Sequence, residues 1–89
     1  MDYQKIHDNI IANAKVRNSN RNDGYVERHH IIPKCLGGDN SKDNLVFLTA
    51  REHYLCHKLL FEIHPNNSSL YFAYHKMALS IDNCKLKNE

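Results

Sequence analysis

Four of the seven histidines fall within residues 27–57, at spacings that suit the binding of one divalent metal ion. His53 and His57 are four residues apart, so on a helix both imidazoles emerge from one face and can bind the same ion. His29 supplies a third nitrogen ligand if its segment folds against that helix. Three neutral nitrogen ligands leave at least one coordination position open, which is the arrangement of a catalytic metal site rather than a closed structural one.

His30, next to His29, is the candidate general base of this site. Imidazole has an unperturbed pKa of about 6.5, so it can take a proton from water near neutral pH. Consecutive residues of a regular strand point to opposite faces, so both histidines can reach one site only at a strand end or an irregularity. Pro33 follows shortly afterwards and predicts such an exit from the strand.

Two short strands and a helix must position these histidines. Residues 25–32 mix β-branched and aromatic side chains and end at a proline, which predicts a first strand. Residues 34–43 contain two consecutive glycines with Asp, Asn and Ser, and predict a loop in which glycine adopts backbone angles barred to other residues. Residues 44–48 form an apolar run that is long enough for a second strand and too short for a buried helix.

The helix that carries His53 and His57 has a clear predicted start. Thr49 and Glu52 form a capping box, in which each side chain satisfies the other residue's backbone N–H at the first turn. The helix should run from there to about Ile63, before the next proline.

Helices are expected on both sides of this core. An amphipathic pattern predicts an N-terminal helix capped by Asp2, with one face that docks on the core, and a polar, turn-rich loop over residues 18–24 should follow it. Ser68 or Ser69 can cap a last helix that packs on the core, and the tail 84–89 is expected to be frayed. The apolar stripes are Tyr3, Ile6, Ile10 and Ala14 in the first helix, and Leu70, Tyr71, Tyr74, Met77, Ala78 and Ile81 in the last.

Length and composition predict a single small α+β domain over residues 1–89, made of an N-terminal helix (1–18), the core (25–63) and a C-terminal helix (68–82). Twelve Lys and Arg against 10 Asp and Glu give a net charge of +2, which permits nucleic-acid binding without indicating it. Three widely spaced cysteines fit neither a disulfide framework nor a CxxC zinc site. With no signal-peptide run or membrane span in the sequence, we expect an intracellular protein.

Residues 27–57, ERHHIIPKCLGGDNSKDNLVFLTAREHYLCH, resemble the HNH endonuclease motif, a hairpin and helix around a metal that is also called the ββα-metal fold. The two helix histidines are similar to those of the colicin-type DNase branch, and PKCLGGDNSKDNLVFLTAREH resembles free-standing phage nucleases of the homing type. The segment lacks the CxxC pairs of some members, and no separate DNA-binding module follows. The resemblance implies metal ligands at His29, His53 and His57, a base at His30, a loop-tying residue that holds this base at Asn44, and an acidic residue near the site at Glu27.

The implied activity is hydrolysis of a DNA phosphodiester, in the cytoplasm of a bacterial host and on double-stranded DNA. His30 would activate water for in-line attack, while one divalent ion contacts a phosphate oxygen and stabilises the leaving 3′ oxygen, which leaves 5′-phosphate ends. Three nitrogen ligands suit Zn, Ni, Co or Mn better than Mg, yet related enzymes often use Mg or Mn, so Zn, Mn, Ni and Mg all stay open. Four basic residues near the site are candidate phosphate contacts: Lys34, Arg51, Lys42 and Lys58.

Other interpretations remain open. A non-catalytic zinc module of the same fold that binds DNA or a protein would use the same ligands, although it would have no need of His30. Within the enzymes, a nonspecific toxin-like nuclease or an RNase is a third possibility. Cys35 and Cys56 are expected to be small buried residues rather than zinc ligands, and the remaining histidines, His7, His64 and His75, to be surface or hydrogen-bonded core residues.

Overall fold

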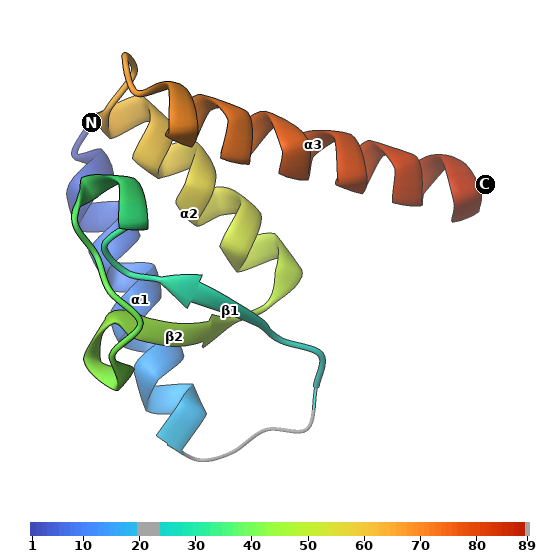
Figure 1. Ribbon diagram of the computed structural model, residues 1–89. Coiled ribbons are helices and arrows are strands. Elements are labelled where there is room, and N and C mark those ends of the chain that lie inside the picture. Colours follow the sequence, from blue (N-terminus) through green and yellow to red (C-terminus); the bar gives the residue numbers. More distant parts are fainter. Residues whose placement is uncertain (20–23, 89) are drawn as a thin grey trace.

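The fold is α+β, with two antiparallel strands and three helices in the part of the chain that is described (Figure 1). The computed structural model describes the backbone of residues 1–19 and 24–88, and the side chains of residues 1–17 and 24–80. The elements are α1 (Tyr3–Ser19), β1 (Glu27–His30), β2 (Leu45–Leu48), α2 (Ala50–Ile63) and α3 (Ser68–Asn88), with short 3-10 turns η1 (Lys34–Leu36) and η2 (Lys42–Asn44) between the strands.

The hairpin sets which residues face the helices. β1 and β2 pair antiparallel, with Glu27 opposite Leu48 and His29 opposite Val46. His29, Val46 and Leu48 are buried, whereas Arg28 and Phe47 in the alternate positions are exposed, as the two-residue period of a strand requires. The first strand is shorter than the expected 25–32, and His30 is its last residue. His30 thus lies at a strand end, one of the two arrangements that would let His29 and His30 reach one site.

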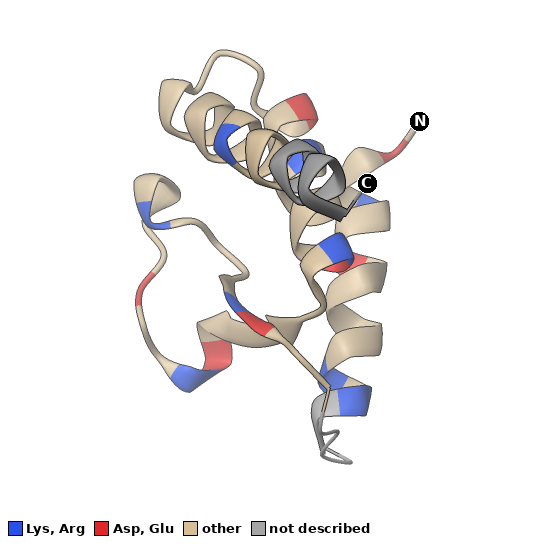
Figure 2. Ribbon diagram, turned by 90° about the vertical axis from the view of Figure 1, so that its right-hand side faces the viewer, with Lys and Arg blue, Asp and Glu red and all other residues tan. Residues whose placement is uncertain are grey.

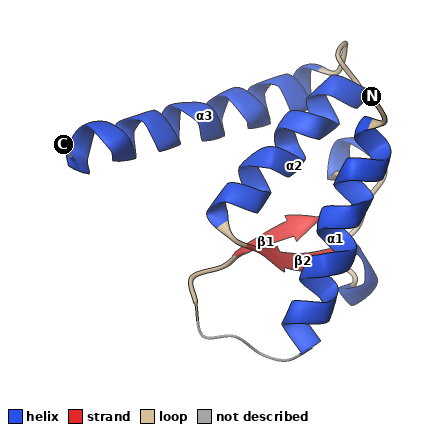
Figure 3. Cartoon of the chain, turned by 180° about the vertical axis from the view of Figure 1, so that it is seen from behind, coloured by secondary structure: helices blue, strands red, loops and turns tan. Residues whose placement is uncertain are grey.

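Helix α1 lies across the hairpin, with α2 beside it (Figure 3). The side chain of Asp2 accepts a hydrogen bond from the Lys5 N–H at 3.0 Å, so the expected cap is confirmed. The expected apolar face was wrong in part: Ala14 is buried, but Ile6 is 37% exposed. The buried side of the helix instead carries His7, Ile11 and Ala14.

The predicted loop over residues 18–24 is only partly within the described chain. The backbone of residues 18 and 19 belongs to α1, so the helix continues into the segment expected to be a loop. Residues 20–23 lie outside the described residues.

Helix α2 starts with the predicted capping box, which is confirmed. Thr49 Oγ1 accepts from the Glu52 N–H at 3.2 Å, and Glu52 Oε1 accepts from the Thr49 N–H at 2.9 Å. Arg17, at the end of α1, holds the same carboxylate through two hydrogen bonds of 2.8 and 2.9 Å and donates to the Phe47 carbonyl at 3.2 Å. The start of α2 is therefore fixed to both α1 and β2. The core between these elements consists of Ile11, Ala14, Val46, Leu48 and Cys56.

The long connection between the strands is held from inside by Asn44. Its side chain accepts from the Ile32 N–H at 2.8 Å and donates to the carbonyls of Ile32 (3.0 Å) and Asp39 (2.8 Å). Gly37 has a φ of 97°, as expected of a turn glycine. Gly38 is needed for another reason: a Cβ there would lie 1.7 Å from the Ile32 oxygen.

Helix α3 packs its first turns on α2 and then projects beyond the rest of the molecule (Figure 1). Its cap is Asn67, whose Oδ1 accepts from the Leu70 N–H at 3.0 Å, so the expected cap at Ser68 or Ser69 was one or two residues too late. Leu70 is buried, and Tyr74 stacks on Phe61 with ring centroids 5.8 Å apart. The helix continues to Asn88 rather than 82, because neither Gly nor Pro interrupts it.

Charged residues are scattered along the described chain. Figure 2 shows Lys and Arg interspersed with Asp and Glu over the ribbon, in keeping with the small net charge of +2. No helix of the described residues is long and apolar enough to cross a membrane.

Candidate metal centre

The hairpin and α2 bring His29, His53 and His57 together. A potential ligand atom of each lies within 4.8 Å of those of the other two. The ring centroids are 5.1 Å apart for His29 and His53, 5.2 Å for His29 and His57, and 4.8 Å for His53 and His57. The two α2 residues share a face through their four-residue spacing, and His29 reaches them because it lies on the inward face of β1.

Glu27 orients one of the three imidazoles. Its carboxylate accepts a hydrogen bond from His53 Nδ1 at 2.8 Å and another from the Tyr25 hydroxyl at 2.5 Å. The hydrogen bond from Tyr25, and then the one from His53, lower the pKa of Glu27, so this side chain is a carboxylate at neutral pH. A proton on Nδ1 leaves the lone pair of His53 on Nε2. This is the arrangement in which a metal-binding histidine is held by a carboxylate.

Two members of the cluster, His29 and His57, stay neutral because they are buried. Burial, and then the neighbouring histidines, lower the pKa of His29 to about 2 and that of His57 to about 4. Both ring nitrogens of His29 and Nδ1 of His57 are buried with no hydrogen-bond partner among the described residues. Neutral imidazoles with free lone pairs are what a divalent transition metal requires, so the residues present fit such an ion.

His30 lies beside the cluster and has a partner of its own. His29 and His30 line one cavity together with Arg28, His53 and His57, so the strand end lets two consecutive histidines reach the same space. His30 Nε2 donates to the amide oxygen of Asn40 at 2.7 Å. With the hydrogen on Nε2, the lone pair of His30 is on Nδ1, the nitrogen from which it can accept a proton.

Among the described residues, no hydrogen bond joins Asn44 to His30. Its side chain holds the backbone of Ile32 and Asp39, and Asp39 precedes Asn40, the partner of His30. Asn44 therefore acts on the loop, and Asn40 acts on the histidine. Asn40 was missed in the sequence because it falls within a run of loop-forming Asp, Asn and Ser residues.

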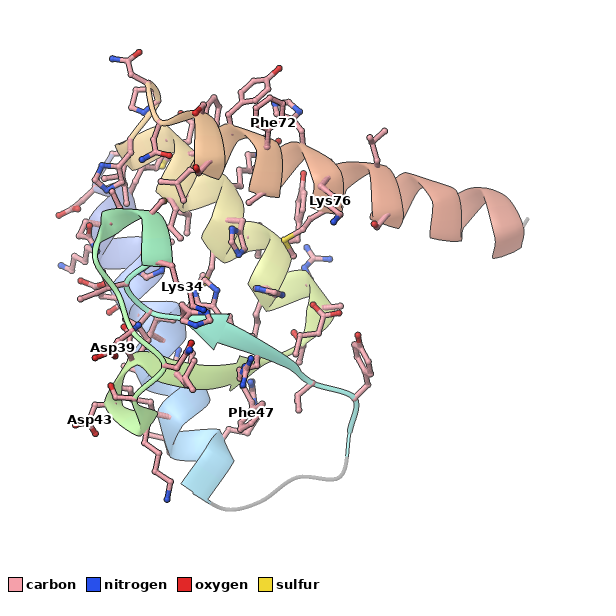
Figure 4. All side chains as sticks on the ribbon, viewed as in Figure 1. Lys34, Asp39, Asp43, Phe47, Phe72 and Lys76 are labelled. Atoms are coloured by element: carbon pink, nitrogen blue, oxygen red, sulfur yellow. The ribbon has the colours of Figure 1, made fainter. Side chains whose placement is uncertain are left out.

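Basic residues reach the cluster from three elements. Arg28 of β1 and Lys34 of η1 line the cavity that holds the histidines, which has a volume of about 370 Å³. Lys76 of α3 lines an adjoining cavity with Glu27 and His53, and Figure 4 shows Lys34 and Lys76 extending from their separate elements. Arg28 adjoins the histidine pair and was overlooked, whereas nothing in the sequence around Lys76 relates it to the site.

The other basic residues expected near the site lie elsewhere or are simply exposed. Lys58 lines a different cavity, between α1 and α2. Lys42 is exposed in η2, and Arg51 is exposed in the first turn of α2.

A second group of potential ligands adjoins the first. His7, His29 and Cys56 are all buried, with potential ligand atoms within 4.8 Å of one another. His7 is the core residue that was one of the two expectations, since it is 1% exposed and its Nδ1 hydrogen-bonds to Asp8, but its Nε2 has no hydrogen-bond partner among the described residues. Cys56 is buried as expected, but Cys35 is exposed.

Comparisons with known proteins find relatives among phage proteins named as probable mobile endonucleases. The chain is 46% identical over 76 residues to "Probable mobile endonuclease D" of Enterobacteria phage T4, in an alignment that covers 83% of this chain and 29% of the relative. It is 47% identical over 77 residues to "Probable mobile endonuclease E" of the same phage, with 86% of this chain and 52% of the relative covered.

A third relative, "Probable mobile endonuclease B" of this phage, is 38% identical over 91 residues, with 100% of this chain and 34% of the relative covered. No family model and no solved structure matches. The chain thus spans between 29% and 52% of the length of these three relatives, and it is similar over most of its own length to proteins named as mobile endonucleases.

Proposed function

We propose that this chain is an HNH nuclease domain that hydrolyses phosphodiester bonds of double-stranded DNA with one divalent metal ion and a histidine base. The observation that carries the proposal is the cluster of His29, His53 and His57, three imidazoles brought together beside a separate histidine. The similarity to phage proteins named as mobile endonucleases supports the same activity.

His29, His53 and His57 would hold the ion. When bound, it supplies positive charge that stabilises the scissile phosphate and the leaving oxygen. Glu27 keeps the lone pair of His53 on Nε2, available to the metal. Zinc, nickel and manganese suit this donor set, and magnesium is less favoured because it prefers oxygen ligands.

His30 would take the proton from the attacking water. Asn40 fixes its ring by accepting the Nε2–H, which leaves Nδ1 as the basic nitrogen. Arg28 and Lys34 line the same cavity and supply positive charge for a phosphate group, and Lys76 adjoins it from α3. Contacts of this type recognise the backbone rather than the bases, so we expect weak sequence preference and strong sensitivity to salt.

The test is cleavage of supercoiled plasmid across a panel of divalent metals, with His30→Ala and His57→Ala compared with the parent protein. His30→Ala should keep metal binding and lose cleavage by about 10²–10⁴-fold, the usual contribution of a general base. His57→Ala should weaken metal binding, and excess metal should restore part of its activity by mass action.

The same experiment separates the enzyme from a non-catalytic zinc module. A parent protein that binds zinc and DNA but cuts under none of the metals would contradict the nuclease proposal and favour the binding module. Equal activity of His30→Ala and the parent would remove His30 as the base. His64→Ala serves as the matched control, because His64 lies at the far end of α2 and should cut like the parent.

A further inference from the structure

One of the proposed metal ligands, His29, has buried nitrogens for which the other two ligands provide no hydrogen-bond acceptor. Both nitrogens of His29 are buried and without a partner among the described residues. A metal would use the lone pair of one nitrogen, and the other nitrogen then carries a hydrogen that needs an acceptor. An unsatisfied buried donor destabilises the folded protein, and metal-bound histidines almost always donate their second N–H.

His7 of α1 lies where this acceptor is needed. The His7 and His29 rings meet edge-on with centroids 5.9 Å apart, and potential ligand atoms of His7, His29 and Cys56 are within 4.8 Å of one another. His7 is 1% exposed, and its Nε2 is a buried polar atom that has no partner among the described residues. Two buried imidazoles, each with a nitrogen that lacks a partner among the described residues, thus lie side by side at the boundary between α1 and β1.

The other nitrogen of His7 decides which of the two rings donates. His7 Nδ1 lies 3.2 Å from a carboxylate oxygen of Asp8. A carboxylate only accepts hydrogen bonds, so Nδ1 carries the hydrogen and the lone pair of His7 is on Nε2. His7 in this tautomer can accept from His29 and cannot donate to it.

We propose that His7 is a positioning residue of the metal centre: its Nε2 accepts the N–H of His29, so that a chain from the Asp8 carboxylate through His7 fixes the tautomer and orientation of His29. This inference rests on the proposed metal site and adds a residue outside the hairpin and α2. It gives α1 a part in metal binding.

A second metal ion on His7, His29 and Cys56 is the competing explanation of the same cluster. It would require His29 to bind one ion through each nitrogen and so to lose its remaining proton. It would also require the Cys56 thiolate, although burial raises the pKa of this thiol to about 12. A hydrogen bond satisfies the same two imidazoles without either change.

The first measurement is the tautomeric state of the histidines in the metal-free protein, by long-range ¹H–¹⁵N NMR at pH 7.5. We expect His7 to carry its hydrogen on Nδ1, and His29 to carry a hydrogen on one nitrogen whose resonance shifts in His7→Leu. His7 with its hydrogen on Nε2 would overturn the proposal, because that nitrogen could not accept.

The second measurement is zinc affinity by competition with a chelator. His7→Leu removes the acceptor, and we expect the dissociation constant to rise about 10–100-fold, the usual effect of losing the partner of a ligand. In His7→Gln, the amide oxygen can take the place of Nε2, so most of the affinity should return. Cys56→Ala is the matched control in the same cluster and should bind zinc like the parent.

These outcomes separate the inference from the proposed nuclease activity. Parent-like zinc affinity in His7→Leu, or no recovery in His7→Gln when its metal-free fold melts like that of the parent, would overturn the role of His7. Two zinc ions per chain that fall to one in His7→Leu would make His7 a ligand and also overturn it. A parent protein with the expected tautomers and zinc affinity but no cleavage would instead refute the nuclease proposal alone.

Discussion

The two adjacent histidines of β1 have different surroundings, and these surroundings explain how they can have different chemistry. His29 is buried at 2% exposure among other imidazoles, and its pKa is lowered to about 2, which suits a ligand that must stay neutral. His30 is only partly buried and hydrogen-bonds to the side chain of Asn40. A base needs such an arrangement, because it must exchange protons with water while its ring is held in place.

Asn40 should therefore control the efficiency of the base. We predict that Asn40→Ala lowers the cleavage rate by up to about 10²-fold, the loss that follows from a misplaced catalytic group, and leaves zinc affinity unchanged. In Asn40→Asp, a carboxylate would stabilise the imidazolium form of His30, so the acidic limb of the pH–rate profile should move to higher pH.

The control for Asn40 is Asp43→Asn, in the exposed η2 turn of the same connection. Single-turnover cleavage measured from pH 5 to 9 distinguishes the variants. An unchanged pH profile in Asn40→Asp would show that Asn40 supports only the loop and does not act on His30.

At the level of elements, the carboxylate of Glu52 joins helix α1 to the start of α2 and also caps α2. Glu52 completes the capping box with Thr49 and also receives both ends of the Arg17 guanidinium. Hydrogen bonds from Arg17 lower the pKa of Glu52. His53 follows Glu52 directly, so this joint sets the position of one side of the metal cluster relative to His7 on α1.

Substitutions of Glu52 should separate its two tasks. Glu52→Gln keeps the capping hydrogen bond and loses the charge, and we expect it to lower the free energy of unfolding by about 0.2–1 kcal/mol, since the pair is partly exposed. Glu52→Ala loses the cap as well and should cost about 1–2 kcal/mol. Urea denaturation measures both, with Glu62→Gln on the exposed side of α2 as the control. Equal losses for the Gln and Ala variants would contradict the capping contribution.

The same helix shows how far the sequence predicted the fold and the site. The capping box, the two strands and the histidine spacing depend on local rules, and these elements appear in the predicted segments, although the first strand is shorter than predicted. The apolar face of α1 was drawn through Ile6 and Ile10, and histidine is not an apolar residue, so His7 was left out of the predicted buried face. His7 is buried with the ring of a second histidine, His29, against it, and that contact between distant segments cannot be read from the sequence.

At the scale of the whole molecule, the small core contains buried histidines, and burial lowers the pKa values of two histidines, His29 and His57. Of the seven buried hydrophobic residues in the described chain, five form one cluster. Three polar residues, His7, His29 and Asn44, are also buried. A domain of this size has few apolar contacts to spare. Protonating its buried histidines should therefore act on the stability of the entire fold.

We predict that the metal-free protein loses stability as the pH falls below about 6.5. The pKa values of His29 and His57 are lowered from 6.5 to about 2 and about 4, so below 6.5 the unfolded chain binds protons that the folded chain does not. Their contribution is complete above pH 6.5 and is lost as the pH falls toward the folded-state values. Each such histidine changes the free energy of unfolding by about 1.4 kcal/mol per pH unit, so both together change it by about 2.7 kcal/mol per unit.

Urea denaturation in the presence of a chelator, at pH 7.5, 6.0 and 5.0, measures this slope. The hydrogen bonds that lower the pKa values of Glu27 and Glu52 add a further loss of stability only at lower pH. His57→Leu should reduce the slope by about half, and His75→Gln, an exposed histidine of α3, should leave it unchanged. The fall from pH 6.5 to 5.0 removes about 4 kcal/mol at this slope, which approaches the stability of a marginally stable domain, so the metal-free parent should be much less stable at pH 5.0 than at pH 7.5. Stability that is flat from pH 7.5 to 5.0 would mean that these imidazoles are protonated at no cost, and the neutral, metal-ready cluster would have to be abandoned.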